Sequence, residues 1–266
     1  MDKIGIIGLG NMGEAIVKTL LNSNVKKELI ACFDIKEERV KFIEDSYGVK
    51  FTGSIEELIK KSKYIILSIK PQDSGKILKS ISHLINDNKI IISIMAGITL
   101  SNITSLAGKS IKTIRMMPNI CVKVGEGAVG ISPGPDINRE ELEEVKSLMF
   151  PMGKIIELGE ELMDAITALG GSGPAFFLLF LEAMIDAGVK IGIARDKSNI
   201  ICTQVIKGTL KMLEEEGIHP TLMKEMITSP AGTTIAGLSI LEERAFKGNI
   251  IKAVERSMER AKELSL

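Results

Sequence analysis

Residues 3–14 read KIGIIGLGNMGE, a short apolar run that leads directly into Gly8, Gly10 and Gly13. This order of strand, glycines and helix is typical of the first turn of a dinucleotide-binding unit. Gly8 permits the tight turn, Gly10 lets the backbone approach a pyrophosphate, and Gly13 lets the helix pack closely on the strand. The free N–H groups that open the helix then face the phosphates. The stretch therefore predicts a nucleotide site rather than a simple glycine-rich turn.

Length and charge narrow the class of protein. With 266 residues the chain exceeds what one core usually fills, so we expect two domains. Its 34 Lys and Arg balance 34 Asp and Glu, and no basic run is long enough to follow a phosphate backbone. The ligand should accordingly be a small molecule, with no nucleic acid as partner.

The cysteines and histidines argue against two kinds of site. Cys32, Cys121 and Cys202 lie far apart with no CxxC pattern, which favours a reducing compartment over a disulfide framework. His83 and His219 are isolated surface candidates, so neither a metal cluster nor a Ser-His-Asp triad can be drawn. We expect no metal.

Two segments bear on location. The first strand begins almost at residue 1, which leaves no room for a signal peptide and predicts a cytoplasmic protein. The most apolar stretch, residues 175–181, is too short to span a membrane. We therefore expect no membrane partner and interpret this stretch as a buried helix.

From residue 3 to about residue 157, short β-branched runs alternate with amphipathic helical patterns. The alternation predicts an α/β domain built as a parallel sheet wrapped by helices. We expect strands at residues 3–7, 29–33, 64–68, 90–94, 111–116, 127–131 and 154–157. We expect helices near residues 12–21, 37–47, 55–60, 72–84 and 139–148.

After Leu158 the β-branched runs stop and the pattern is helical to the end. We therefore expect a Rossmann-type dinucleotide-binding domain over residues 1–158 and an all-α domain over residues 159–266. Residues 176–184 are apolar around more of the helix than one neighbour covers. A partner subunit is the simplest cover, and a fully buried central helix is the alternative.

Asp34 follows the second expected strand, about twenty residues after the glycines. A carboxylate there accepts hydrogen bonds from a ribose 2′-hydroxyl and repels a 2′-phosphate, which favours NADH over NADPH. Lys36 and Arg39, on the next turn, could partly reverse that preference. The alternative is an ordinary helix N-cap aspartate.

Three loops follow later strands at the edge where an open α/β sheet binds ligands. Lys70 lies in the sequence SIKPQ and is expected at the mouth of the nicotinamide pocket, or else is a solvated lysine before a helix. Ala96 and Gly97 form a small-residue rim where backbone can approach a cofactor. Asn119, after Pro118, can hydrogen-bond in either sense, and a plain turn is its alternative.

Residues 229–235, SPAGTTI, form another loop whose residue types suit ligand binding. Two hydroxyl residues and a glycine that open a helix present N–H donors suited to a carboxylate. Taken alone, a helix-capping loop is the simpler interpretation.

Together these segments resemble the pyrroline-5-carboxylate reductase family over essentially the whole chain. The resemblance rests on GLGNMG at 8–13, KPQ at 70–72, MPN at 117–119, Asp164-Ala165 leading to GSGP at 171–174, and SPAGTT at 229–234. The chain departs from the usual family pattern at Ile120-Cys121, where Thr-Pro is common, and at Ala231, where glycine is common.

The resemblance implies an enzyme that adds a hydride to the C=N bond of Δ1-pyrroline-5-carboxylate, giving L-proline in the last step of proline biosynthesis. It also implies a homodimer with interlocked helical domains, so that the 229–234 loop and the nicotinamide come from different subunits, and assembly to a decamer. NADH or NADPH would be the cofactor.

Matching the motifs residue by residue assigns roles. The cofactor residues would be Gly8, Gly10, Asn11, Met12, Asp34, Ser54, Ser68, Lys70, Pro71, Ala96 and Glu160. The substrate residues would be Ser229, Gly232, Thr233 and Thr234. A cyclic imine is easily protonated, so positioning should dominate catalysis. We expect Thr234 to hydrogen-bond the imine nitrogen and Lys70 to tune the electrostatics.

Two alternative functions stay open from the sequence. One is a related imine reductase or β-hydroxyacid-type dehydrogenase, although residues 170–190 offer no well-placed helical lysine before Lys190. The other is a non-catalytic NAD-binding regulator, which would not need the 229–234 loop.

Overall fold

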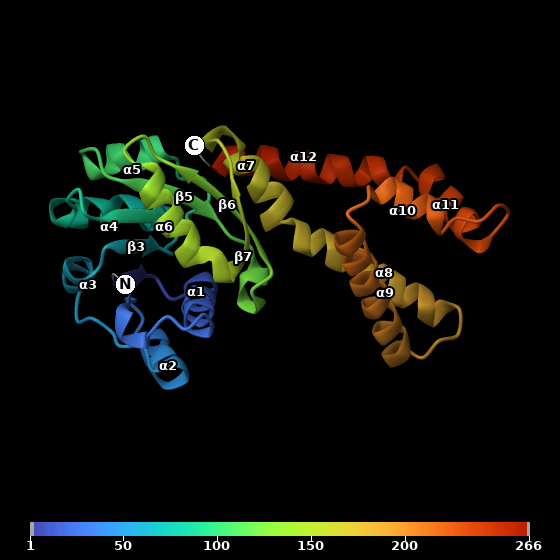
Figure 1. The fold of residues 1–266 in the computed structure, drawn as a ribbon, viewed down its shortest axis with the longest axis horizontal. Helices are drawn as coiled ribbons and strands as arrows, with labels where there is room; N and C mark the ends of the chain where they lie inside the picture. Colours follow the sequence, from blue (N-terminus) through green and yellow to red (C-terminus); the bar gives the residue numbers. More distant parts are fainter. Residues whose placement is uncertain (1–2, 265–266) are drawn as a thin grey trace. The chain divides into compact units, whose positions relative to one another are not determined.

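The computed structural model describes residues 3–264 and divides the chain into two compact units (Figure 1). The first unit contains the residues up to Ser172 and those from Ser257 onward, and the second contains residues 173–256. The expected α/β dinucleotide-binding fold followed by a helical region is confirmed.

The first unit is built on a sheet of seven strands in the order β2-β1-β3-β4-β5-β6-β7. The strands are β1 (Ile4–Ile7), β2 (Ile30–Phe33), β3 (Tyr64–Leu67), β4 (Ile90–Ser93), β5 (Thr113–Met117), β6 (Gly127–Pro133) and β7 (Gly153–Glu157). All seven expected strands are present, with ends that shift by one or two residues. Strands β1, β3 and β4 are buried along their whole length because helices cover both faces.

The expectation of a purely parallel sheet is wrong at one strand. β6 runs antiparallel to β5, while β7 is again parallel to β6. Only residues 118–126 separate β5 from β6, including the short turn η4 (Ile120–Val124). A parallel crossover needs a dozen or more residues, so this connection is too short to return the chain to the other end of the sheet.

Helices cover the sheet on both faces. Those of the first unit are α1 (Asn11–Asn22), α2 (Glu37–Tyr47), α3 (Ile55–Lys61), α4 (Ser74–Ile81), α5 (Leu100–Ala107), α6 (Arg139–Met149) and α7 (Met163–Ile166). Ile16 of α1 and Val145 of α6 belong to the core on one face, and Leu58 of α3, Leu78 of α4 and Ile103 of α5 to the core on the other. This is a doubly wound arrangement, whose ligand edge lies at the carboxyl ends of the strands.

Helix α5 was not expected from the sequence. Its stretch LSNITSLA is short and rich in Ser, Thr and Asn, which gives a weak helical pattern. It is stabilised at its start by Thr99, whose side chain accepts from the N–H of Asn102 while the Asn102 side chain accepts from the N–H of Thr99. Gly108 ends it in a left-handed conformation.

Short 3₁₀ and π segments connect these elements. They are η1 (Lys27–Leu29), η2 (Pro71–Asp73), η3 (Ser82–Leu84), η5 (Phe150–Met152), η6 (Glu160–Leu162) and the π-helical η7 (Thr167–Gly171).

The second unit is helical. Its helices are α8 (Gly173–Lys190), α9 (Arg195–Glu216), α10 (Pro220–Met226), α11 (Thr233–Glu243) and α12 (Phe246–Leu264), the last of which continues into residues of the first unit. Gly188 of α8 packs tightly on Ser198 of α9: a Cβ on Gly188 would lie 2.1 Å from the Ser198 hydroxyl oxygen. Phe180 and Phe246 add a ring contact at 6.0 Å.

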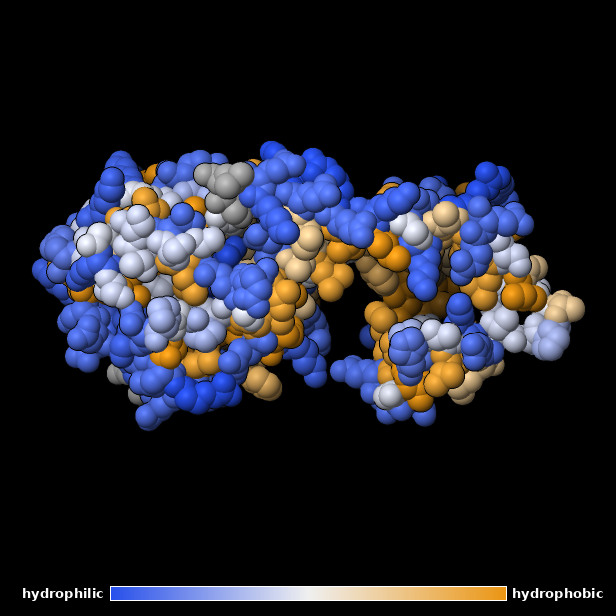
Figure 2. Space-filling view, turned by 90° about the horizontal axis from the view of Figure 1, so that it is seen from above, coloured by the Kyte–Doolittle hydropathy of each residue, from blue (hydrophilic) through white to orange (hydrophobic). Residues whose placement is uncertain are grey.

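Within the single chain, the second unit leaves much apolar surface uncovered. Residues 175–181 are not buried within their own chain as expected, because Leu178 is 60 % and Leu179 66 % exposed. Figure 2 shows hydrophobic residues, in orange, gathered over these helices. Exposed patches of this extent mark an interaction surface.

Candidate dinucleotide and substrate sites

The glycine turn after β1 has the geometry that a dinucleotide site requires. Gly8 has a φ of +93°, and a Cβ there would lie 2.3 Å from the carbonyl oxygen of Ser68. A Cβ on Gly13 would lie 2.1 Å from the carbonyl oxygen of Gly8. By contrast, nothing lies within 4 Å of a Cβ on Gly10. Gly8 and Gly13 are thus required by the protein itself, whereas Gly10 faces open space.

Helix α1 begins at this open space. Its first hydrogen bond runs from the N–H of Glu14 to the carbonyl of Gly10, at 3.0 Å. The N–H groups of Asn11 and Met12 therefore have no partner within the helix. Gly10 and Asn11 are exposed. These donors and the positive end of the helix dipole suit a pyrophosphate.

Asp34 lies directly after β2 and is bound to the glycine turn. Its Oδ2 accepts from the N–H of Leu9 at 2.6 Å, and its Oδ1 accepts from the N–H of Lys36 at 2.9 Å. The N-cap of α2 is Lys36, so the interpretation of Asp34 as an ordinary helix cap is wrong. Asp34 is half-buried, so its carboxylate retains lone pairs for ribose hydroxyls.

Arg39, on the first turn of α2, is engaged by the same turn. Its Nε donates to the carbonyl of Leu9 at 2.9 Å, and its Nη2 lies 2.6 Å from Oε2 of Glu14. Tyr47 donates to the other oxygen of Glu14 at 3.1 Å. Burial acts to raise the pKa of Glu14, but the hydrogen bonds from Arg39 and Tyr47 outweigh it and the pKa is lowered. Sequence reasoning missed Glu14, whose importance depends on a partner 25 residues away.

The two serines assigned to the cofactor, Ser54 and Ser68, both lie near the ends of strands. Ser54 is the N-cap of α3, and its hydroxyl accepts from the N–H of Glu57 at 3.1 Å. The segment before it runs beside β2, where the N–H of Thr52 donates to the carbonyl of Cys32. Ser68 follows β3, and its N–H donates to the carbonyl of Ile7 at 2.8 Å. Ser54 thus follows a segment paired with β2, and Ser68 lies beside the end of β1.

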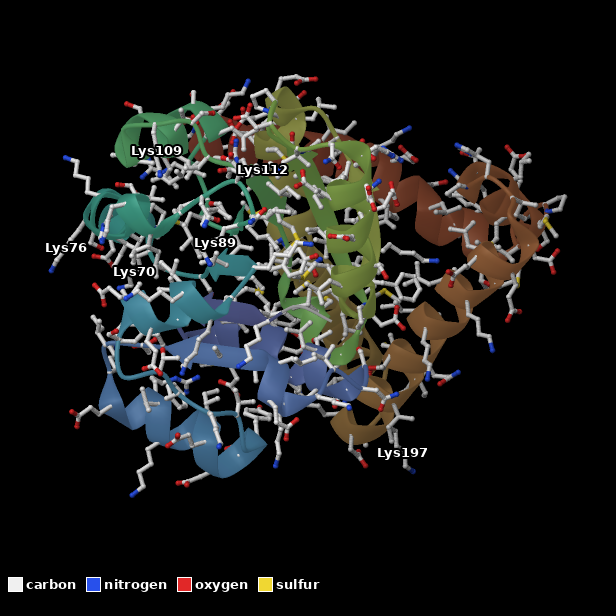
Figure 3. The ribbon with its side chains drawn as sticks, turned by 60° about the vertical axis from the view of Figure 1, so that its left-hand side comes forward. Lys70, Lys76, Lys89, Lys109, Lys112 and Lys197 are labelled. Atoms are coloured by element: carbon white, nitrogen blue, oxygen red, sulfur yellow. The ribbon has the colours of Figure 1, made fainter. Side chains whose placement is uncertain are left out.

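The loops after β3 and β4 carry the other assigned residues. Lys70, labelled in Figure 3, is exposed and precedes Pro71 at the start of η2. Ala96 is exposed after β4, next to Gly97, which has a φ of +77°. Because β1, β3 and β4 are parallel neighbours, their following loops share one edge of the sheet.

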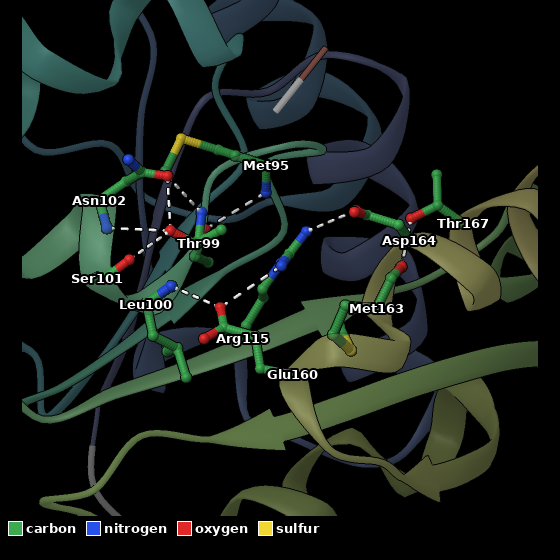
Figure 4. Close-up of polar contacts among 11 residues, drawn as sticks. Met95, Thr99, Leu100, Ser101, Asn102, Arg115, Glu160, Met163, Asp164 and Thr167 are labelled. Atoms are coloured by element: carbon green, nitrogen blue, oxygen red, sulfur yellow. Dashed lines mark hydrogen bonds and ion pairs between the residues drawn. The ribbon is translucent and has the colours of Figure 1, made fainter. Parts of the chain in front are cut away.

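Behind this edge lies an ionic cluster around one buried arginine, which sequence reasoning missed (Figure 4). Arg115 of β5 is only 2 % exposed, and its guanidinium lies 3.4 Å from both Glu160 Oε1 and Asp164 Oδ1. Glu160 also accepts from the N–H of Leu100 at 2.6 Å. The signal was available as one arginine inside the apolar strand TIRMM. Glu160, assigned to the nicotinamide by resemblance, is therefore also a structural partner of Arg115.

A second contact fixes the same region. Asn119 donates from Nδ2 to the carbonyl of Gly170 at 3.0 Å and accepts from the N–H of Cys121. Arg115 and Asn119 together hold residues 160–170 against β5 and the loop that follows it.

The opposite, amino-terminal edge of the sheet carries a basic hollow of about 540 Å³. Two of its lysines are engaged: Lys89 donates to the carbonyls of Ile59 and Ser62, and Lys112 pairs with Glu141 at 2.5 Å. Lys89 and Lys112 are labelled in Figure 3. The lining residues precede the strands, so the hollow lies at the end of the sheet opposite the glycine turn that follows β1.

The 229–234 loop belongs to the second unit and opens α11. Gly232 is the N-cap, and no side chain makes a capping hydrogen bond there, so the hydroxyls of Ser229, Thr233 and Thr234 are not used as caps. A Cβ on Gly232 would lie 2.3 Å from the Ser229 hydroxyl oxygen. Ala231 has a φ of +55°, in the region that favours glycine, which is the residue common in the resembling family.

No group of His, Cys, Asp and Glu that could hold a metal occurs in residues 3–264. His83 and His219 are both exposed. The three cysteines are free thiols.

Fold and site together define a class: a two-unit protein with a Rossmann-type unit whose glycine turn, acidic residue after β2 and ligand edge suit a nicotinamide dinucleotide. Comparison with family models agrees. Residues 160–264 match the model described as pyrroline-5-carboxylate reductase dimerisation, and residues 3–97 match the model described as NADP oxidoreductase, coenzyme F420-dependent.

Two relatives that match over the whole chain are pyrroline-5-carboxylate reductases. The chain is 37 % identical over 264 residues to a pyrroline-5-carboxylate reductase of Methanosarcina acetivorans, covering 99 % of this chain and 98 % of that protein. It is 35 % identical to one of Aquifex aeolicus, covering 98 % and 97 %. The chain belongs to the pyrroline-5-carboxylate reductase family, whose members are NAD(P)H-dependent oxidoreductases.

Solved structures agree. The pyrroline carboxylate reductase of Plasmodium falciparum with NADP bound has a TM-score of 0.90 at 32 % identity, covering 100 % of this chain and 98 % of that one. That of Coxiella burnetii has a TM-score of 0.93 at 26 % identity, covering 100 % and 99 %. A prephenate dehydrogenase of Aquifex aeolicus, at 15 % identity and a TM-score of 0.56, shares the fold alone.

The dimerisation model explains the exposed helices. By length and apolar composition, the helical stretch Glu160–Lys190 would suffice to cross a membrane. It lies within the segment that matches the dimerisation model, however, and a subunit interface accounts for the same apolar surface. The match to the dimerisation model confirms the expectation of a homo-oligomer.

Proposed function

We propose that this protein reduces the C=N bond of Δ1-pyrroline-5-carboxylate to L-proline, the last step of proline biosynthesis. The main support is the similarity to a pyrroline-5-carboxylate reductase over 99 % of the chain, in which both the glycine turn and the 229–234 loop are present. The reaction adds a hydride to the imine carbon and a proton to the nitrogen, so atoms and charge balance.

The first unit would hold the dinucleotide. Gly8, Gly10, Asn11 and Met12 would bind the pyrophosphate through the free N–H groups that open α1. Asp34 and Ser54 would face the adenosine ribose. The nicotinamide side would be lined by Ser68, Lys70, Pro71, Ala96 and Glu160. When bound, the reduced nicotinamide supplies the hydride.

The second unit would hold the substrate. Ser229, Gly232, Thr233 and Thr234 open α11, where uncapped N–H groups and hydroxyls suit a carboxylate. Thr234 would hydrogen-bond the ring nitrogen and orient the imine. Lys70 would tune the electrostatics of the site. The iminium carbon is already electrophilic, so orientation carries most of the rate.

We further propose that NADH is preferred to NADPH. Asp34 would bring a carboxylate close to a 2′-phosphate, and Arg39, one of the two nearby cations, is engaged by Leu9 and Glu14. The related P. falciparum structure holds NADP. This chain's preference would therefore depend on its own Asp34 and its surroundings.

For the assembly, we propose a dimer in which the 229–234 loop and the nicotinamide come from different subunits, with further association to a decamer. The dimerisation model over residues 160–264 supports a functional division near residues 158 and 159. We also propose a cytoplasmic location, which the free thiols of Cys32, Cys121 and Cys202 favour.

The test follows cofactor oxidation by the purified protein with pyrroline-5-carboxylate and with a panel of keto acids. Turnover of the imine, lost in Thr234→Val but kept in Ser239→Ala, supports the proposal; Ser239 is an exposed hydroxyl on the same helix. Turnover of a keto acid without the imine would favour the dehydrogenase alternative. Cofactor binding without any turnover would favour the regulator.

A further inference from the structure

Glu14 is an ionised side chain with no role in the reaction described above. It lies on the first turn of α1, and its two oxygens are bound by Arg39 at 2.6 Å and by Tyr47 at 3.1 Å. Its side chain is 21 % exposed and that of Arg39 28 %. The pair is therefore partly shielded from solvent.

Arg39 is the guanidinium nearest in the chain to the residue that selects the cofactor. Asp34 accepts from the N–H of Leu9, while Arg39 donates to the carbonyl of the same residue. Asp34 and Arg39 thus bind the backbone N–H and the backbone carbonyl of the same residue, Leu9, in the glycine turn. A guanidinium this close to the ribose site is the group that recognises a phosphate best, through two parallel hydrogen bonds.

In this structure the guanidinium is directed elsewhere. Its Nε is used by Leu9 and its Nη2 by Glu14, and its carbon lies 4.9 Å from the ring centre of Phe42. To bind a 2′-phosphate through Nε and Nη2 together, Arg39 would have to give up the ion pair with Glu14. Breaking the ion pair with Glu14 would then weaken the binding of the phosphate by the free energy of that pair.

We propose that Glu14 is a positioning residue that determines cofactor specificity: it withholds Arg39 from a 2′-phosphate and so reinforces selection of NADH. The inference rests on the proposed function in one respect, that the adenosine ribose lies at Asp34. It adds a determinant that makes no contact with the ribose itself. The lowered pKa of Glu14, caused by the hydrogen bonds of Arg39 and Tyr47 against the effect of burial, keeps it charged at neutral pH.

The test compares Glu14→Gln with the parent protein in fluorescence titrations of NADH and NADPH and in kcat/KM for each. Removing the charge weakens the hold on Arg39 while keeping the size of the side chain. We expect the NADPH-to-NADH affinity ratio to rise by about threefold or more, the size of one partly exposed ion pair. Equal weakening of both cofactors would mean that Glu14 only supports the glycine turn, and would overturn the proposal.

A matched control removes general charge effects. Glu38 is exposed and lies beside Arg39 on the first turn of α2. Glu38→Gln loses the same charge, and we expect the ratio to stay unchanged. The same rise in both variants would show a long-range charge effect and would overturn the role of the pair.

Two further variants complete the test. Arg39→Met should remove the gain from Glu14→Gln, because the released guanidinium is then absent; a gain that persists would contradict the proposal. Asp34→Ser reports separately on the ribose site. If it shifts the ratio while Glu14→Gln does not, the Glu14 inference alone fails. If neither Asp34→Ser nor Glu14→Gln shifts the ratio, the proposal that the adenosine ribose lies at Asp34 fails as well.

Discussion

The carboxylate of Asp34 lies 2.6 Å from the backbone nitrogen of Leu9, so the acid after β2 is bonded to the glycine turn after β1. One side chain therefore serves both the shape of the turn and the proposed ribose contact. This dual use affects the design of any substitution at Asp34. A shorter side chain loses the bond to Leu9 as well as the charge.

Asp34→Ser should raise NADPH use relative to NADH by about tenfold or more, roughly 1.4 kcal/mol in differential binding. The reason is that like charges at close range in a partly desolvated site repel. The kcat/KM ratio for the two cofactors measures it. Asp34→Asn keeps an oxygen for Leu9 and separates charge from geometry. A parent protein that already favours NADPH, or a ratio unmoved in the Ser variant, would refute this role.

The glycines of the turn should respond differently to alanine. Gly8→Ala meets both the positive φ of +93° and the Ser68 carbonyl at 2.3 Å. It should cost at least about 2 kcal/mol of stability. Gly10→Ala has open space, so stability should change by less than about 1 kcal/mol while dinucleotide affinity falls about tenfold or more. Urea unfolding and cofactor titration of both variants check this pair. Unchanged cofactor affinity in Gly10→Ala would place the pyrophosphate elsewhere.

Arg115→Ala should destabilise the protein by about 2–4 kcal/mol, because it opens a cavity and leaves two carboxylates without their cation. Arg139→Ala is the control: Arg139 is 69 % exposed and pairs with Glu143 and Glu157. Exposed pairs contribute at most about 1 kcal/mol. Urea unfolding at equal protein concentration compares the two. Similar losses in both variants would contradict a structural role of the cluster around Arg115.

The exposed face of α8 should be a subunit contact. Leu179→Asp places a charge where the side chain is now 66 % exposed, and we expect it to shift the oligomer toward monomer. Val124, in the first unit, is 75 % exposed, and Val124→Asp should leave the assembly unchanged. Sedimentation at micromolar concentration is the measurement. A stable folded monomer of the parent protein would disprove the expectation.

Stability should fall at alkaline pH through Cys32. Burial raises the pKa of this thiol from 9.0 to about 12, so the folded state binds a proton that the unfolded state releases. This contribution is fully present below about pH 9 and is lost as the pH rises toward 12. From about pH 8 to about pH 10.5 the loss should be about 2 kcal/mol.

Urea unfolding at both pH values checks this expectation. Cys32→Ala should flatten the alkaline decline relative to the parent protein, while Cys121→Ala, which removes a partly exposed thiol, should not. Burial also raises the pKa of Tyr64, to about 12, with a hydrogen bond to Glu144 acting in the same direction. Tyr64 is common to all three proteins, so the difference between variants isolates Cys32. Equal slopes in all three would refute the assignment.

The sequence by itself determined the strands and most of the helices of the first unit, and it predicted the edge of the sheet at which the dinucleotide would bind. The spacing of Gly8, Gly10 and Gly13 and the short apolar run of each strand are local patterns, so both are visible in neighbouring residues, although Gly8 also packs on the distant Ser68 carbonyl. The position of Asp34 follows from strand order. The short link between β5 and β6 also indicates that β6 runs antiparallel to β5, although the alternation of strands and helices predicted a parallel strand.

Only the tertiary structure decided how charges are paired. Arg39 is bound to Glu14 across 25 residues, and Arg115 to Glu160 and Asp164 across 45 and 49. Such pairs depend on how the helices pack on the sheet, which periodicity does not encode. The exposure of α8 is decided in the same way. An apolar helix reads alike whether its own chain or a second subunit covers it, because burial depends on the distant surface that packs against it.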